Sequence, residues 1–198
     1  MAVSNIGMPD QATWENLFDI KKVFATLKLN GRIQEVVEFG CGYGTFTISA
    51  AEIISGTIHA IDSDPEMIRV TSEAVKKHQL ENVEVIQRDF VLSGSGMKNL
   101  SMDYVMLFNV LNAENQNALF KDAKRVLKKW GYIGVVIWNG DPETPGALEM
   151  EAAPSPEQCR IWARAVGLSF ELKCELKPYF YGMLFVKGNT LKWKDRQI

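Results

Sequence analysis

Short apolar runs alternate with amphipathic stretches along most of this chain. Runs of this kind, bounded by glycine and polar residues, predict buried strands, and apolar residues at a spacing of three and four predict helices. The expected strands cover residues 35–39, 57–62, 82–88, 103–108 and 132–138. The expected helices cover residues 13–29, 45–54, 65–78, 115–130 and 156–166. Strands that alternate with helices predict right-handed crossovers and a parallel sheet.

Local signals support several of these boundaries. Asp64 and Pro65 combine a capping side chain with a proline at the first helical position. Gly56 follows the second helix, as a C-terminal glycine does. For the first helix, either Asp10 or Thr13 is a suitable cap.

The chain closes with two further strand patterns, at residues 169–176 and 180–187 around the segment Lys177-Pro178-Tyr179. We expect them to form an antiparallel hairpin at one edge of the sheet. The predicted fold class is therefore α/β, with a doubly wound, seven-stranded and mostly parallel sheet. Because no internal repeat or linker interrupts the pattern, a single domain over residues 1–198 is expected.

A glycine-rich turn follows the first strand. Gly40, Gly42 and Gly44 stand at alternate positions, and a helical pattern begins at Thr45. Glycines let a ligand lie against the backbone, and the helix N-terminus offers free N–H groups with a partial positive charge. The turn therefore predicts a site for a charged or carboxylate-bearing, nucleotide-like ligand. Its spacing differs from the dinucleotide fingerprint, and no lysine follows to make a phosphate loop.

Four polar residues come at the carboxyl ends of successive strands: Glu38, Asp62, Asp89 and Asn109. Ligands of open parallel sheets bind beyond these strand ends. We therefore expect the four side chains to converge on one crevice.

Composition narrows the class of protein. The 198 residues are 46% hydrophobic and 23% charged, with a net charge of -2, which is typical of a globular domain and lacks the basic footprint of a nucleic-acid binder. The basic segment 187–196 is interpreted as a solvated terminus. No apolar run is long enough to span a bilayer and no signal peptide is evident, so a cytoplasmic location is expected.

Cysteines and histidines give no indication of a metal site. The three cysteines, at positions 41, 159 and 174, form no Cys-x-x-Cys pair, so neither a disulfide framework nor zinc is expected. His59 and His78 lack ligand-spaced partners and are interpreted as structural or solvated.

Taken together, four motifs resemble those of the class I S-adenosylmethionine-dependent methyltransferases, in particular the small-molecule branch grouped as type 11 or UbiE-like. The motifs lie at residues 37–44, 58–62, 87–90 and 102–111, the last followed by 125–132. The match covers nearly everything from residue 36 to residue 187. The resemblance implies a Rossmann-like methyltransferase fold, with S-adenosyl-L-methionine as cofactor and S-adenosyl-L-homocysteine as product.

The resemblance also implies roles for particular residues. Asp62 would accept hydrogen bonds from the ribose hydroxyls, and Asp89 from the adenine amino group. Glu38 would face the methionine ammonium. The implied cofactor-binding set is Glu38, Gly40, Gly42, Gly44, Asp62, Ser63, Met67, Asp89, Phe90 and Asn109. A helix cap for Asp62 and a turn role for Asp89 remain alternatives.

The implied reaction is in-line attack by a small acceptor on the sulfonium methyl group. The leaving group is neutral sulfur, so alignment and exclusion of water matter more than acid catalysis. A general base is needed only if the acceptor loses a proton. No catalytic residue is assigned, and where many relatives carry two histidines this chain has Asn112-Ala113-Glu114.

The acceptor is expected between the N-terminal helix, the end of the fourth strand and the loop after the fifth. Candidate pocket residues are Trp14, Phe18, Asn109, Trp138 and Tyr181, together with Asn112, Asn139 and Tyr179. Core packing is an equally good interpretation of Trp14 and Phe18, and an edge-strand role suits Tyr181. Residues 1–30 would then form a lid, 31–138 the cofactor half, 139–188 the substrate side and 189–198 a tail.

Three other functions stay open at this point. The chain could methylate a protein or an RNA, or serve as a non-catalytic scaffold subunit that retains the fold. A nucleotide-dependent oxidoreductase is disfavoured by the glycine spacing and the terminal hairpin. We expect a small-molecule acceptor, no nucleic-acid or membrane partner, and a monomer or homodimer.

Overall fold

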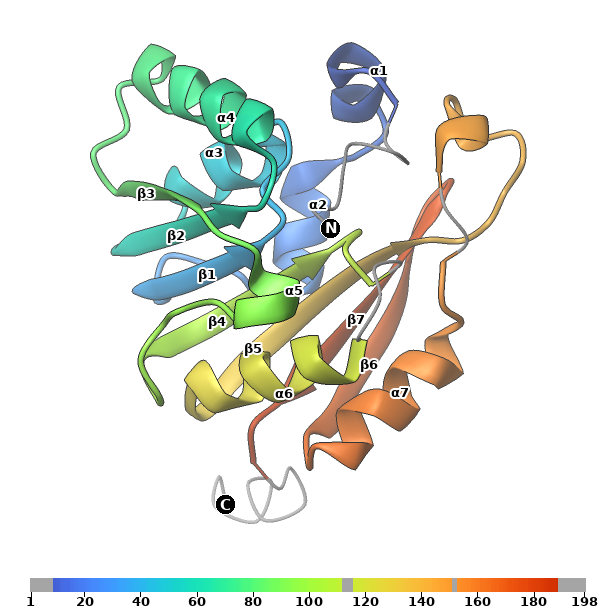
Figure 1. The fold of residues 1–198 in the computed structure, drawn as a ribbon. Coiled ribbons are helices and arrows are strands. Elements are labelled where there is room, and N and C mark those ends of the chain that lie inside the picture. Colours follow the sequence, from blue (N-terminus) through green and yellow to red (C-terminus); the bar gives the residue numbers. More distant parts are fainter. Residues whose placement is uncertain (1–8, 112–115, 151–152, 189–198) are drawn as a thin grey trace.

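A seven-stranded sheet forms the centre of the molecule (Figure 1), as described by a computed structural model for residues 9–111, 116–150 and 153–188. The strands are β1 (Glu35–Phe39), β2 (Thr57–Asp62), β3 (Val83–Gln87), β4 (Met102–Phe108), β5 (Leu127–Trp138), β6 (Ser169–Leu176) and β7 (Phe180–Val186). Their order across the sheet is β3-β2-β1-β4-β5-β7-β6. β7 pairs antiparallel with both β5 and β6, and the other described strand pairs are parallel, which confirms the predicted fold class.

Helices cover both faces of this sheet (Figure 1). They are α1 (Gln11–Asn16), α2 (Ile20–Thr26), α3 (Thr45–Ala51), α4 (Pro65–Lys77), α5 (Phe90–Ser93), α6 (Gln116–Val126) and α7 (Pro156–Ala165), with a 3-10 turn at Ala147–Glu149. Among the described helices, none has the length and apolar character needed to cross a bilayer.

The core consists of two hydrophobic clusters, one on each face. Side chains of a strand alternate between faces, so Val105 and Leu107 of β4 join the cluster under α5, α6 and α7, whereas Tyr104 and Met106 join the one under α1, α2 and α3. This alternation in a buried strand explains why its sequence is continuously apolar.

The expected helix at 13–29 is wrong in one respect, because two shorter helices take its place. The side chain of Asp10 caps α1 by accepting hydrogen bonds from the N–H groups of residues 12 and 13. The side chain of Asp19 caps α2 by accepting one from the N–H of Lys22, at 3.1 Å. A second capping residue inside the amphipathic stretch provides a new helix start, and the chain turns there.

The prediction of a helix at 115–130 is wrong at its end, because α6 stops at Val126 and residues 127–130 belong to β5. The Lys187 ammonium donates hydrogen bonds to the carbonyls of Lys124 and Leu127, each at 2.7 Å, so the freed carbonyls at the helix end are satisfied. Trp130 adopts a left-handed φ of 70° and its N–H bonds to the carbonyl of Lys187. A distant lysine therefore ends this helix.

A buried hydrogen bond joins the N-terminal helices to the sheet. The hydroxyl of Tyr104, a fully buried residue of β4, donates to the carbonyl of Leu27 at 2.9 Å. On the neighbouring strand, a Cβ at Gly134 would lie 2.0 Å from that hydroxyl. The glycine therefore makes room for the tyrosine.

We expect Tyr104→Phe to lower the free energy of unfolding by about 1–3 kcal/mol, because the buried Leu27 carbonyl loses its partner. Urea unfolding monitored by circular dichroism measures this. Tyr132→Phe is the matched control and should change stability by less than about 0.5 kcal/mol. Equal effects of the two substitutions would show that the Tyr104 hydrogen bond does not anchor the helices.

Candidate functional site

The glycine turn between β1 and α3 adopts a backbone that strongly favours glycine. Gly40, Gly42 and Gly44 have φ values of 75°, 52° and 80°, in the left-handed region. The N–H groups of Gly40 and Cys41 donate to the carbonyl of Ile61 at 2.8 and 3.0 Å, which fixes the turn against the end of β2. The turn is therefore held in one shape by the neighbouring strand.

The turn also lies close to the segment that follows β4. A Cβ at Gly40 would lie 2.6 Å from the Cγ1 of Val110. On the α4 side, the Thr71 hydroxyl donates to the Gly42 carbonyl at 2.8 Å. The ends of β1, β2 and β4 thus meet around one backbone loop.

Asp62, at the end of β2, is bound directly to this turn. One carboxylate oxygen accepts the N–H of Gly42 at 2.9 Å, and the other accepts the N–H of Asp64 at 3.0 Å. The side chain is nearly buried, and burial raises the pKa of Asp62. Asp64 has a different task, because it caps α4 through the N–H of Glu66 at 2.8 Å. Asp62 is therefore an oriented acceptor with unused lone pairs.

Glu38 is a buried acid beneath the turn, with 1% of its surface exposed. The hydroxyl of Thr47 donates to it at 2.5 Å. Burial, with a smaller contribution from the charge of Asp62, raises the pKa of Glu38 to about 8. The group is therefore mostly neutral at pH 7, and a cation placed beside it would favour its ionised form.

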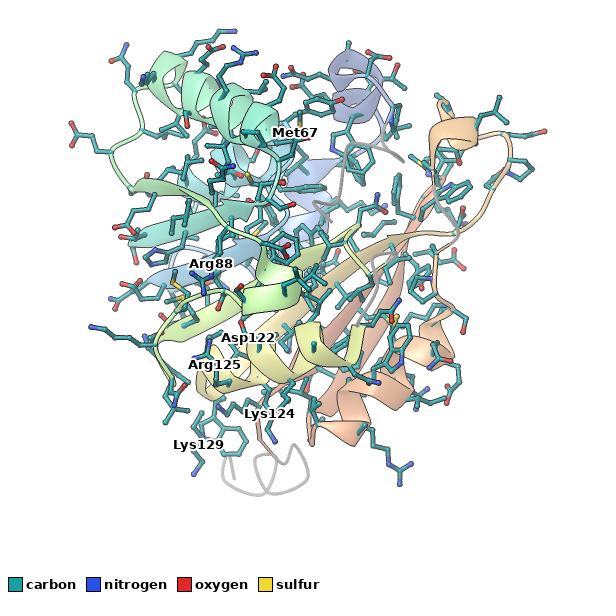
Figure 2. All side chains as sticks on the ribbon, viewed as in Figure 1. Met67, Arg88, Asp122, Lys124, Arg125 and Lys129 are labelled. Carbon is teal, nitrogen blue, oxygen red and sulfur yellow. The ribbon has the colours of Figure 1, made fainter. Side chains whose placement is uncertain are left out.

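Asp89 lies at the neighbouring strand end, because the N–H of Arg88 donates to the Asp62 carbonyl at 2.7 Å. One Asp89 oxygen caps α5, accepting from the N–H groups of residues 91 and 92 at 3.1 and 3.0 Å. The turn role left open by the sequence is thus present, and within the described residues the second oxygen has no partner. Figure 2 labels Arg88, the residue before Asp89, and Met67 of α4.

Two further residues of the implied cofactor set lie in or beside the core. Phe90 packs edge-on against Phe39 with ring centroids 5.6 Å apart, and its ring reaches to 3.7 Å from a Cβ built at Gly40. Met67 is buried in the first turn of α4. Ser63 contributes its backbone N–H to the carboxylate of Asp62. Phe90 therefore packs beside the turn, and Ser63 helps to orient the carboxylate of Asp62.

Trp14 and Phe18 pack in an aromatic cluster. Phe18 lies 4.3 Å from Phe180, 4.9 Å from Phe46 and 4.9 Å from Trp14, measured between ring centroids. These contacts join the N-terminal helices to α3 and β7. Core packing is therefore an established role of both residues.

Asn109 and Trp138 meet at a narrow hollow between the ends of β4 and β5. Its other described lining residues are Leu111, Ile137, Met150, Ala153 and Pro154. The hydroxyl of Tyr181 donates to the carbonyl of Pro154, one of these lining residues, at 2.5 Å. Asn139 bonds to the Pro178 carbonyl at 3.1 Å. Asn112 lies outside the described residues.

Sequence reasoning did not identify Thr47, Thr71 or Met150. Each faces the site only because of the angle at which its element docks on the sheet, and no motif marks it. Cys41 is buried in the turn, and burial raises the pKa of its thiol. Within the described ranges, no group of three or more His, Cys, Asp or Glu side chains is placed to hold a metal ion.

Comparison with known proteins places this geometry in context. A family described as "Methyltransferase domain" matches residues 33–177. The chain is 32% identical over 72 residues to a ribosomal protein L11 methyltransferase from Chloroflexus aurantiacus, covering 36% of this chain and 22% of that protein. It is 30% identical over 131 residues to a demethylmenaquinone methyltransferase from Listeria welshimeri, covering 61% and 52%.

The fold itself is also known. A SAM-dependent methyltransferase from Aquifex aeolicus superimposes with a TM-score of 0.78 at 22% identity, covering 90% of this chain and 94% of that chain. The chain thus spans about a fifth and about half of the two curated relatives.

The raised pKa of Glu38 predicts a pH-dependent stability. The unfolded chain releases this proton near pH 4.5 and the folded protein holds it to about pH 8. The unfolded state therefore binds fewer protons in that window, and the contribution of Glu38 to the free energy of unfolding falls as pH rises. Glu38→Gln cannot ionise. We expect it to match the wild type near pH 5 and to exceed it by a few kcal/mol, as an order of magnitude, at pH 8.5.

Urea unfolding of both proteins at the two pH values measures this difference. Glu73→Gln, which removes an exposed carboxylate of α4 paired with Arg69, controls for the loss of a surface carboxylate and should change the free energy of unfolding by less than about 1 kcal/mol. If the difference in free energy of unfolding between Glu38→Gln and the wild type does not change with pH, Glu38 is not a neutral buried acid.

Proposed function

Since the chain belongs to the methyltransferase-domain family, we propose that it transfers a methyl group from S-adenosylmethionine to a small-molecule acceptor. The observation that carries this proposal is the hydrogen bond from the Gly42 N–H to the Asp62 carboxylate, which places an oriented acceptor beside a turn in which three of five residues are glycine. S-adenosylmethionine supplies a methyl group already activated by a sulfonium centre. The protein then has to bind the cofactor, orient the acceptor toward the methyl group and exclude water from the reaction.

The described residues fit such a cofactor. The free lone pairs of Asp62 suit the hydroxyls of a ribose, which are donors. Asp89, at the next strand end, keeps one oxygen available for an amino group. Glu38 is an acid that burial keeps neutral and that a nearby ammonium would ionise. The three groups match the three polar regions of the cofactor.

The acceptor side supports in-line displacement of neutral sulfur. In the described part of its lining, the hollow between β4 and β5 holds no charged side chain. This arrangement favours alignment over acid–base chemistry.

A protein or RNA acceptor is the second candidate, and one relative is named for methylation of a ribosomal protein. A third possibility is a scaffold subunit that binds cofactor without turnover. The distinguishing experiment incubates the purified protein with methyl-labelled S-adenosylmethionine and, separately, a metabolite extract, a total-protein fraction and total RNA. Label in one small compound supports the proposal, label in protein or RNA supports the second candidate, and cofactor binding with no labelled product in any fraction supports a scaffold.

Asp62→Ala should weaken binding of S-adenosylhomocysteine by about 1.5–3 kcal/mol, or roughly 10- to 100-fold, because hydrogen bonds to a charged acceptor are lost. Isothermal titration calorimetry measures the affinity. Asp64→Ala is the control: it removes the α4 cap, so it should cost about 1 kcal/mol of stability and leave the affinity unchanged. Unchanged affinity in Asp62→Ala would remove Asp62 from the site.

A further inference from the structure

Glu38 is an acid that the fold buries without a counter-charge. Only 1% of its surface is exposed, and in the described part of the chain no lysine, arginine or histidine forms an ion pair with it. An isolated buried carboxylate is costly, so a group in this position keeps its proton. The fold therefore holds a neutral carboxylic acid directly beside the glycine turn.

The elements packed around Glu38 supply no positive charge. From β2, the like charge of Asp62 raises the pKa of Glu38, and from the turn the thiol of Cys41 is influenced in turn by the charge of Glu38. Its register partners are uncharged, Ala60 on β2 and Met106 on β4. The sequence of α3 contains no charged residue. A counter-charge for Glu38 would therefore come from a ligand.

Thr47 is placed to serve the ionised form of this acid. It is fully buried, and its hydroxyl donates to Oε2 of Glu38 at 2.5 Å. Helical serines and threonines often donate to a carbonyl of their own helix, as Ser49 of α3 does to the Thr45 carbonyl at 3.3 Å. Thr47 instead donates across to β1. A donor of this kind favours the carboxylate, and within the described residues Oε1 has no hydrogen-bond partner.

We propose that binding of the cofactor's ammonium group displaces the proton of Glu38 into solvent, and that Thr47 is the positioning residue that presents the resulting carboxylate. This inference rests on the proposed function. The O–H bond of Glu38 breaks, its electron pair stays on the carboxylate, and the proton passes to the buffer. The ammonium keeps its own protons and provides the missing counter-charge. A neutral acid is thus exchanged for a neutral ion pair.

This exchange makes cofactor binding depend on pH. Burial raises the pKa of Glu38 to about 8 in the free protein, and an adjacent ammonium lowers it in the complex. Below that pH each binding event releases a proton, so binding is weaker where protons are abundant. We expect the affinity for S-adenosylhomocysteine to rise about tenfold per pH unit from pH 6 to pH 7.5 and to level off near pH 8.

Isothermal titration calorimetry of the full chain at pH 6.5, in two buffers of different ionisation enthalpy, counts the protons. We expect about one proton released for each S-adenosylhomocysteine bound. The control ligand is 5′-methylthioadenosine, which keeps the nucleoside and the sulfur but lacks the ammonium and carboxylate groups. It should bind without releasing a proton and with an affinity that does not change with pH. Binding of S-adenosylhomocysteine without proton release, or equal release with both ligands, would overturn the inference.

Thr47→Val tests the positioning role. It should weaken S-adenosylhomocysteine about tenfold at pH 7 and move the pH at which affinity levels off upward by about one unit, because the ionised acid loses a donor. Thr47→Ser keeps the hydroxyl and should restore both values. Ser49→Ala, which removes a hydroxyl from the same helix, should leave the pH profile unchanged.

Two results would contradict this assignment. A Thr47→Val protein that is less stable but keeps the wild-type pH profile would overturn the role of Thr47. If neither S-adenosylhomocysteine nor 5′-methylthioadenosine binds at any pH, the proposed function fails, and this inference fails with it.

Discussion

The hydrogen bond between the Gly42 N–H and the Asp62 carboxylate is the contact on which the site depends. It joins the first turn of the sheet to the end of the neighbouring strand, and it forms only because a left-handed glycine turns its N–H toward β2. The same bond gives the carboxylate one orientation. The shape of the glycine turn and the orientation of the Asp62 carboxylate are therefore fixed together, and neither needs to reorganise for a ligand to bind.

Around that contact, the two halves of the crevice differ in chemistry. At the glycine turn the protein buries acids, and burial keeps Glu38 mostly protonated near pH 7. Among its described lining residues, the hollow between β4 and β5 is apolar except for the amide of Asn109. The two named relatives differ in the acceptor that their names give, a ribosomal protein and demethylmenaquinone, so sequence similarity does not reveal the acceptor of this chain.

The sequence predicted the sheet better than the helices. Mostly apolar runs located β1 and β2 to the residue, because both strands are largely buried, and the alternation of apolar and polar residues located the edge strand β6. The end of α6 was missed because Lys187, sixty residues beyond, caps its carbonyls. The four-residue α5 is too short to show a helical period. In the site, strand-end acids were visible as a pattern, whereas the pairing of Thr47 with Glu38 depends on how α3 docks and leaves no trace in sequence.

The strand order has a consequence for biosynthesis. β7 is made after β6, yet it lies between β5 and β6. As the chain leaves the ribosome, the long edge of β5 stays unpaired until residue 186 has emerged, and β6 has no strand beside it in the meantime. At ordinary translation rates this interval lasts a few seconds. An open apolar edge of that kind is prone to intermolecular pairing, and closure of the β6–β7 hairpin onto β5 removes it.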